Sequence, residues 1–349
     1  MRLGRAHRGG AVKRSIALAL AAATLLPFAL SGCFGDPAPT SITLVAYDSF
    51  PTKDTPLNTA LAEFTKQSGI EVTVVTAGDA GTMVTKAALT AGNPEGDVMW
   101  GVDNTLLSAA TDGKVFDGDP VPVDSGDVCI NYDVAWYADK GLEPPTTLDD
   151  LIDPKYKGQL VVENPATSSP GLAFLLATIA HSGDDGWSQY WAALRANDVA
   201  VVDSWESAYY EKFSGSAGSK GDRPLVVSYG TSPPAEVVFS DPPIDPVKGA
   251  APTGVAADTC FRQTEYAGVL RGTKHGDAAQ KLVEFLTGER FQRELPLTLF
   301  VYPANTAVTL PDVFTRFGVQ PDQPFTMDPA RIAANRTTWQ DTWNTIVLG

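Results

Sequence analysis

Residues 42–75, ITLVAYDSFPTKDTPLNTALAEFTKQSGIEVTVV, decide the fold class of this 349-residue chain. Apolar runs at 42–47 and 70–75 predict strands, and the segment 57–67 between them predicts a helix. The same alternation continues through a helix and a strand over residues 81–101. Strands that alternate with helices are typical of a largely parallel sheet covered on both faces. We therefore predict an α/β fold whose ligands bind beyond the carboxyl ends of its strands.

A second α/β unit begins near Val128 and interrupts the first. Its predicted elements are strands at 128–132, 160–163 and 225–228, helices at 172–180, 187–196 and 204–213, and a proline-rich loop at 233–252. A strand at 261–265 then returns the chain to the first unit, and helices follow near 278–287, 289–295 and 329–347. We therefore predict two α/β lobes joined by two crossing strands, with a hinged ligand cleft between them. Lobe 1 comprises residues 41–128 and 262–310, lobe 2 comprises 129–261, and 311–349 form a C-terminal helical extension.

The first 32 residues predict a signal peptide of the lipoprotein type. A basic segment precedes an apolar run of about fifteen residues, which is too short to span a bilayer. The run ends in Leu30-Ser31-Gly32-Cys33, which resembles the bacterial lipobox, and residues 33–40 would form a lipidated tether. The alternative is an ordinary signal peptide with an incidental cysteine. We expect an extracytoplasmic protein that is anchored through lipid on Cys33 to the outer face of the cell membrane.

The chain is strongly acidic once the predicted signal peptide is removed. Residues 1–32 contain basic residues and no acid, which leaves 21 basic residues against 41 acidic ones and a net charge of about −20. Such a surface repels nucleic acid and anionic headgroups, and it favours a cationic ligand. A gain in solubility alone is the other explanation of the acidity.

Cys129 and Cys260 are the two cysteines that remain besides Cys33. In an oxidising compartment such a pair predicts a disulfide. A nucleophilic thiol would need a histidine or carboxylate partner, and His181 and His275 both lie far from the cysteines in sequence. Since Cys129 and Cys260 fall on the two predicted crossing strands, we expect their disulfide to staple the hinge without locking it.

Aromatic residues beside acids and small hydroxyls recur at predicted strand ends, while the short motifs of nucleotide loops, zinc proteases and serine hydrolases are absent. The clearest cases are YDS (47–49), WESAYY (205–210), SYGTSP (228–233) and FVYP (300–303). A single aromatic side chain is usually a packing residue. Together they favour a flat cationic heterocycle, because an aromatic face attracts a cation by ~0.5–2 kcal/mol.

Five segments in a fixed order carry a resemblance to a known family: YDSF (47–50), GVDNTLL (101–107), NPATSSPGL (164–172), SYGTSP (228–233) and FVYP (300–303). With them the chain resembles the thiamine-binding periplasmic proteins of the type II solute-binding superfamily, over nearly its whole mature length. The resemblance implies a two-lobed periplasmic-binding-protein-like II fold. It also implies a monomeric, non-enzymatic component of an ABC importer that binds thiamine or a thiamine phosphate. No cofactor, metal or catalytic residue is expected, and the partners would be an ABC permease and its ATPase subunit.

The resemblance further implies which residues contact thiamine. The hydroxyethyl arm or its phosphates would meet Asp79, Ala80, Gly81, Ser168 and Ser169; a ring would stack on Trp205; Tyr229, Gly230, Thr231 and Ser232 would line the opposite wall; and Tyr47 and Phe300 would close an aromatic box. Asp79 or Asp103 would neutralise the thiazolium. Both acids could equally cap the helices that follow them, and Ser168 could serve only the turn before Pro170.

Three other functions remain open from the sequence. The chain could bind another small cation, such as a polyamine or ferric iron. It could be a thiaminase-like enzyme on the same fold, which would need a free nucleophilic cysteine. It could also be a structural or adhesive lipoprotein, which would show no ligand-dependent thermal shift.

Overall fold

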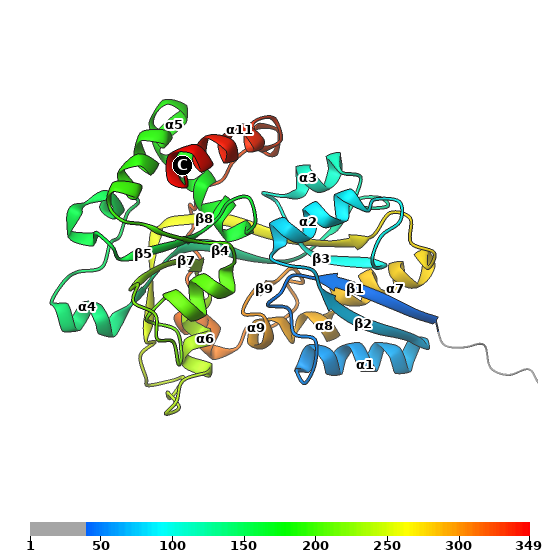
Figure 1. Ribbon diagram of the computed structural model, residues 1–349. Helices are drawn as coiled ribbons and strands as arrows, with labels where there is room; N and C mark the ends of the chain where they lie inside the picture. Colours follow the sequence, from blue (N-terminus) through cyan, green and yellow to red (C-terminus); the bar gives the residue numbers. More distant parts are fainter. Residues whose placement is uncertain (1–39) are drawn as a thin grey trace, which may run out of the picture. The chain divides into compact units, whose positions relative to one another are not determined.

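A nine-stranded sheet organises the computed structural model, which describes residues 40–349 (Figure 1). The strands follow the order β2-β1-β3-β8-β4-β7-β5-β6, and β9 pairs with β4 outside this path. They are β1 (Thr40–Ala46), β2 (Ile70–Thr76), β3 (Val98–Asp103), β4 (Val121–Asp133), β5 (Leu160–Glu163), β6 (Ala200–Val202), β7 (Leu225–Tyr229), β8 (Thr253–Val269) and β9 (Tyr302–Pro303). The predicted signal peptide, Cys33 and all of the predicted tether except Thr40 lie outside the described residues.

The α-helices are α1 (Pro56–Ser68), α2 (Ala80–Leu89), α3 (Leu107–Asp112), α4 (Val134–Lys140), α5 (Ser169–Ala196), α6 (Ser232–Val238), α7 (Gly276–Thr287), α8 (Glu289–Gln292), α9 (Leu295–Thr298), α10 (Asp312–Phe317) and α11 (Pro329–Val347). Two short 3-10 turns, η1 (Asp149–Ile152) and η2 (Pro154–Tyr156), and one π-helix, η3 (Ser207–Lys212), complete the set. Within residues 40–349, no helix has the length and apolar character needed to cross a membrane.

The strand–helix–strand unit predicted at the start of the chain is present. β1 pairs in parallel with β2 on one side and with β3 on the other. Helix α1 connects β1 to β2. It begins at a capping box formed by Thr55 and Asn58 and ends at Gly69, whose φ of 71° suits glycine. α1 and α7 pack on one face of these strands, and α2 and α3 pack on the other. Coverage of both faces is what parallel strands require.

Two long antiparallel strands connect this first group of strands to a second. β4 pairs with β8 from Val121 opposite Ala267 to Asp133 opposite Thr253. At one end β8 pairs with β3, and at the other end β4 pairs with β7 (Figure 1). The crossing strands predicted at 128–132 and 261–265 are thus parts of longer strands. The predicted disulfide is present, and it joins Cys129 of β4 to Cys260 of β8. The lobe boundaries placed near these strands stay a prediction.

The second group of strands consists of β7, β5 and β6, which pair in parallel. The two helices predicted at 172–180 and 187–196 both lie within α5, and Gly183, whose φ of 73° and ψ of 173° are not helical, separates them. The last helix, α11, has the bounds predicted for it and packs against α5. The rings of Trp191 and Trp343 lie 5.4 Å apart at this contact.

Some predictions for the second group were wrong in detail. The proline-rich loop predicted at 233–252 starts inside helix α6, because Pro233 and Pro234 occupy its first turn, where a missing N–H breaks no helical hydrogen bond. The helix predicted at 204–213 is present over residues 205–212, but most of it is the π-helix η3 and not an α-helix. The elements α4 and β6 were not predicted at all.

Candidate ligand-binding cavity

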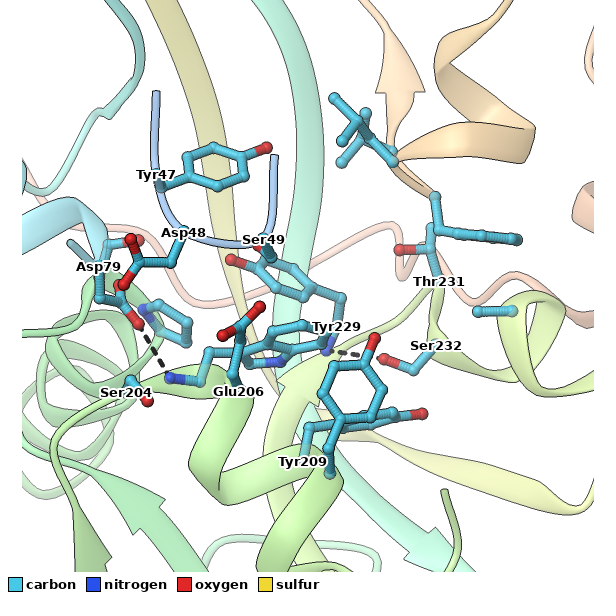
Figure 2. Close-up of a pocket in the computed structure, with 18 of the residues that line it drawn as sticks. Tyr47, Asp48, Ser49, Asp79, Ser204, Glu206, Tyr209, Tyr229, Thr231 and Ser232 are labelled. Carbon is cyan, nitrogen blue, oxygen red and sulfur yellow. Dashed lines mark hydrogen bonds between the residues drawn. The ribbon is translucent and has the colours of Figure 1, made fainter. Parts of the chain in front are cut away.

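A cavity of about 510 Å³ lies where strand ends and helix starts from both groups of strands come together (Figure 2). Its lining comes from the segment after β1, the start of α2, the start of α5, the segment around η3, the end of β7, α6, β8 and the segment after α9. The residues are Tyr47, Asp48, Ser49, Asp79, Ala80, Ser169, Pro170, Ser204, Trp205, Glu206, Tyr209, Tyr210, Ala217, Tyr229, Thr231, Ser232, Ala235, Glu236, Phe239, Glu265, Thr298, Leu299, Phe300 and Val301. A volume of this size is typical of small-molecule sites, which span about 300–1,000 Å³.

Trp205 is an aromatic side chain of the wall that is held by hydrogen bonds and by a stacked ring. Its indole Nε1 donates a hydrogen bond to Ser228 Oγ at 3.0 Å, and its backbone N–H donates to Asp79 Oδ2 at 2.8 Å. The Trp205 ring stacks on Tyr209 at 5.0 Å and 16°, and it lies 6.2 Å from the ring of Tyr229. One hydrogen bond from the indole, one from the backbone of the same residue and a stacked neighbour therefore fix the position of this ring in the cavity wall.

A second group of aromatic side chains lies toward the rim of the cavity. Phe239 and Tyr210 are largely exposed, and the ring of Phe300 lies 5.4 Å from that of Phe239 and 6.2 Å from that of Phe314. The backbone of Phe300 has a φ of 55°, a region that bulky residues rarely adopt. Such strain costs about 1–3 kcal/mol and is found mostly at functional sites. The segment that carries Phe300 is thus held in place by its surroundings.

Five carboxylates line the cavity: Asp48, Asp79, Glu206, Glu236 and Glu265. Burial raises the pKa of Glu206, and the nearby charges of Asp48 and Glu211 raise it further. Burial also raises the pKa of Glu236, although this side chain accepts hydrogen bonds from Tyr209 Oη at 2.8 Å and Ala217 N–H at 2.7 Å. Within residues 40–349, no lysine, arginine or histidine lines the cavity. The site is therefore electronegative and has no basic side chain of its own.

Asp79 serves as a helix cap and as a cavity wall at the same time. Its Oδ1 accepts a hydrogen bond from Ala80 N–H at 2.7 Å at the start of α2. Its Oδ2 accepts the bond from Trp205 N–H, a residue that lies 126 positions further along the chain. Burial raises the pKa of Asp79 to about 6 in spite of these hydrogen bonds. Near neutral pH this carboxylate is thus ionised, but it gains a proton readily.

Glu265 and Thr231 carry polar atoms that find no partner within the described residues. Glu265 Oε2 and Thr231 Oγ1 are buried without a hydrogen bond, and both residues line the cavity. Burial raises the pKa of Glu265 well above its usual value, and the charges of Asp124 and Asp103 raise it further. A buried polar atom without a partner costs about 1–3 kcal/mol, so a ligand that bonded to it would recover that cost.

Comparison with known proteins identifies the family. The family model of the bacterial extracellular solute-binding protein matches residues 48–293. The chain belongs to this family. The solute-binding protein is 27% identical to the thiamine-binding periplasmic protein of Escherichia coli (strain K12) over 319 residues, which cover 88% of this chain and 93% of that one. The proteins of this family bind solutes and are not enzymes.

Solved structures agree with this assignment. A periplasmic thiamin binding protein superposes with a TM-score of 0.76 at 26% identity, over 88% of this chain and 96% of that chain. A Bordetella ferric binding protein superposes with a TM-score of 0.58 at 19% identity, over 88% of this chain and 98% of that one, which shows a shared fold alone. The predicted periplasmic-binding-protein fold and the predicted resemblance to thiamine-binding periplasmic proteins are both confirmed.

Most residues predicted to contact the ligand line the cavity of this solute-binding protein. They are Tyr47, Asp79, Ala80, Ser169, Trp205, Tyr229, Thr231, Ser232 and Phe300. The fold thus brings together segments that are more than 250 residues apart in the sequence. Their contact with a ligand stays a prediction.

Four residues of the predicted set lie behind the lining. Asp103 is fully buried, accepts hydrogen bonds from Thr105 N–H at 2.8 Å and Leu106 N–H at 3.0 Å, and caps that turn. Ser168 is buried at the start of α5. The two glycines permit close backbone contacts, because an added Cβ would lie 2.6 Å from Thr167 O at Gly81 and 2.2 Å from Val319 O at Gly230. These positions shape the site from behind.

Several residues that line the cavity were not predicted as site residues. Glu206, Tyr209 and Tyr210 belong to the aromatic and acidic run 205–210, so their signal was visible in the sequence. Glu236 and Phe239 fall in the segment that was predicted to be a loop, and Glu265 sits inside a strand. Only the structure shows that the side chains of these three residues face the cavity.

Proposed function

We propose that this solute-binding protein captures thiamine in the cavity and delivers it to an ABC importer. One observation carries the proposal: aromatic rings and five carboxylates line a cavity to which, among the described residues, no basic side chain contributes. Thiamine combines two flat heterocycles with a permanent positive charge on its thiazolium ring. The printed names of the Escherichia coli relative and of the superposed thiamin binding protein point to the same ligand.

The chemistry of binding follows from two kinds of contact. The Trp205 indole offers a fixed face on which a cationic ring gains ~0.5–2 kcal/mol from cation–π attraction and ~0.5–1.5 kcal/mol from stacking. The carboxylates of Asp79 and Glu206 supply the compensating negative charge. These attractions are stronger at the buried positions of the wall than they would be on the surface. The unpartnered atoms of Thr231 and Glu265 can bond to polar groups of the ligand.

The proposal extends to how the protein works in the cell. Lipid on Cys33 would keep it at the outer face of the membrane, as the lipobox predicts. Hinge motion between the predicted lobes would close the cavity on thiamine, with the Cys129–Cys260 disulfide stapling the crossing strands. A closed, loaded protein would then present its ligand to the permease and its ATPase subunit. Ligand binding favours closure only through contacts that the open form lacks.

The other functions left open by the sequence fit less well. Ferric iron would want paired tyrosines together with histidine or carboxylate ligands, and among the described residues no histidine lines the cavity, which disfavours iron. Cys129 and Cys260 are joined to each other, so neither offers the free thiol that a thiaminase-like enzyme needs. A polyamine would satisfy the carboxylates, but it has no planar ring to stack on the aromatic side chains of the cavity wall.

Calorimetric titration with thiamine and, separately, with spermidine tests the proposal. We expect one thiamine per protein and weaker binding of spermidine. Trp205→Ala should weaken thiamine binding by about 5- to 400-fold, the equivalent of the stacking and cation–π contributions together. Trp136→Ala on α4 is the matched control, since Trp136 does not line the cavity and its loss should leave the affinity unchanged. If thiamine gave neither binding heat nor a thermal shift, the proposed function would be wrong.

A further inference from the structure

We propose that Glu236 is a positioning residue of the cavity, which holds the ring of Tyr209 against one face of the Trp205 indole. The proposal rests on the proposed function and deepens it, because it names what keeps the aromatic wall in place for thiamine. Glu236 lies on α6 and is one of the five carboxylates that line the cavity. The sequence did not mark it, because it falls in a segment that was predicted to be a loop.

Both carboxylate oxygens of Glu236 are engaged by the protein itself. Oε1 accepts a hydrogen bond from Tyr209 Oη at 2.8 Å, and Oε2 accepts one from Ala217 N–H at 2.7 Å. Burial and the charge of Glu236 raise the pKa of Tyr209 well above its usual value, so the phenol keeps its proton and remains the donor. Because Glu236 is only 4% exposed, little of its surface is left for a ligand. Its effect on binding should therefore pass through Tyr209.

Tyr209 is the middle ring of a row of three. Its ring stacks on that of Trp205 at 5.0 Å and 16°, and it also lies 5.5 Å from the ring of Phe213. The three residues are spaced four positions apart along one helical segment, so their side chains follow one another on one face. Phe213 is fully buried and packs with apolar side chains of β5 and β7. The row thus connects the cavity wall to a buried apolar cluster, and Tyr209 is the link between them.

Helix α6 holds this pair of stacked rings at two points. Ser228 Oγ accepts the indole N–H of Trp205 at 3.0 Å, and Ser232 Oγ lies within hydrogen-bond distance of Ser228 Oγ, at 2.9 Å. One helical turn further along α6, Glu236 holds the hydroxyl of Tyr209. Residues four positions apart lie on the same face of a helix, so one face of α6 orders both rings. An indole held only by its N–H would tilt about that bond, and the ring of Tyr209 removes this freedom.

Calorimetric titration of thiamine into the full chain tests the proposal by a double-mutant cycle. Tyr209→Phe removes the hydroxyl and keeps the ring, whereas Glu236→Gln removes the charge and one acceptor. Each should weaken thiamine binding by about three- to tenfold, the usual range for the loss of one hydrogen bond. Because both changes break the same hydrogen bond, the double variant should bind within about twofold of the weaker single variant. Losses that multiplied in the double variant would show that Glu236 acts on the ligand directly, and would overturn the proposal.

Tyr137→Phe is the matched control for the loss of a buried hydroxyl. The Tyr137 hydroxyl donates to Gln159 Oε1 at 2.6 Å and is as buried as that of Tyr209, but Tyr137 does not line the cavity. Its loss should leave the affinity for thiamine unchanged. Glu71→Gln, at an exposed position on β2, is the control for net charge and should also have no effect. If Tyr137→Phe weakened binding as much as Tyr209→Phe, the effect would come from general destabilisation, and the proposal would be wrong.

Fluorine NMR of the ligand-free protein, labelled with fluorotryptophan, separates this proposal from the proposed function. The Trp205 signal is the one that disappears in Trp205→Phe. Glu236→Gln should shift this signal, because the ring stacked on the indole changes its position, whereas Tyr137→Phe should leave it unchanged. Tyr209→Phe provides the same test if Glu236→Gln does not fold.

A Trp205 signal that stayed in place in these two cavity variants would overturn the positioning role, whether or not thiamine binds. A shifted signal in a protein that bound no thiamine would support the positioning role and show that the proposed function is wrong.

Discussion

Two pairs of facing residues on β4 and β8, here called rungs, lie three residues apart. Each holds a buried carboxylate, but one carboxylate faces a basic side chain and the other faces an acidic one. At one rung Asp127 faces Arg262 and accepts hydrogen bonds from its guanidinium, one of them at 3.2 Å. At the other rung Asp124 faces Glu265, and within the described residues neither oxygen of Asp124 has a hydrogen-bond partner.

The two rungs differ in their position relative to the cavity. The paired rung does not line it, whereas Glu265 of the acidic rung does. We interpret the acidic rung as a place where a bound cation takes the role that Arg262 has at the paired rung. The comparison teaches that the crossing strands combine a rung whose charges compensate each other with a rung of two acids whose pKa values are raised by burial.

Breaking the paired rung should have the largest effect. Arg262→Met leaves the buried carboxylate of Asp127 without a partner, which should lower the free energy of unfolding by about 3 kcal/mol. We expect the lower end of the usual range, because the Arg262 side chain is 35% exposed and water can still reach the pair. Urea unfolding followed by circular dichroism measures the change.

A double variant provides the control for this prediction. Asp127→Asn combined with Arg262→Met removes both charges, so part of the lost stability should return. An Arg262→Met protein as stable as the parent would show that the paired rung does not stabilise the fold, and the contrast between the rungs would disappear.

The acidic rung should make the free energy of unfolding depend on pH. Burial and the charge of Asp103 raise the pKa of Asp124, so the folded protein holds a proton that the unfolded chain releases. The corresponding stability is present below the unfolded pKa near 4 and is lost as the pH rises through the higher folded value. Asp124→Asn should therefore reduce the drop in unfolding free energy between pH 5 and pH 8 by about 1 kcal/mol or more. If Asp124→Asn left the drop in unfolding free energy unchanged, a group other than Asp124 would be responsible for it.

The smallest expected effect concerns the ligand. Thiamine should bind more weakly at pH 5 than at pH 7.5, by about three- to tenfold, because Asp79 with a pKa of about 6 is then protonated and no longer attracts the cation. Titrations at pH 6 in two buffers of different ionisation enthalpy should also reveal proton release on binding. An affinity that rose as the pH fell would contradict the role of the carboxylates.

Local patterns in the sequence were sufficient for most of the fold. The strand at 160–163 and the helix at 329–347 were predicted with their observed bounds, because an apolar run of limited length or a helical period is a local property. Two adjacent prolines at 233 and 234 predicted a loop, although prolines also fit the first turn of a helix, as in α6.

The site could be predicted only where its residues form a run. Trp205 stood out within an aromatic and acidic segment. Glu265 did not, because an acid in a strand usually faces solvent, and only the pairing of β8 with β4 turns it toward the cavity. Asp103 was predicted as a possible ligand contact and is instead buried beneath a turn that it caps. Whether an acid caps a helix, contacts a ligand or does both depends on neighbours distant in sequence.

The hydrogen bond from Trp205 N–H to Asp79 has a practical consequence for anyone who studies this protein. It joins the start of α2 to the segment before η3, so separating these two segments must break it and bring water to the indole. The wavelength and intensity of Trp205 fluorescence would then report on that separation. Opening and closing could be followed in real time without attaching a dye.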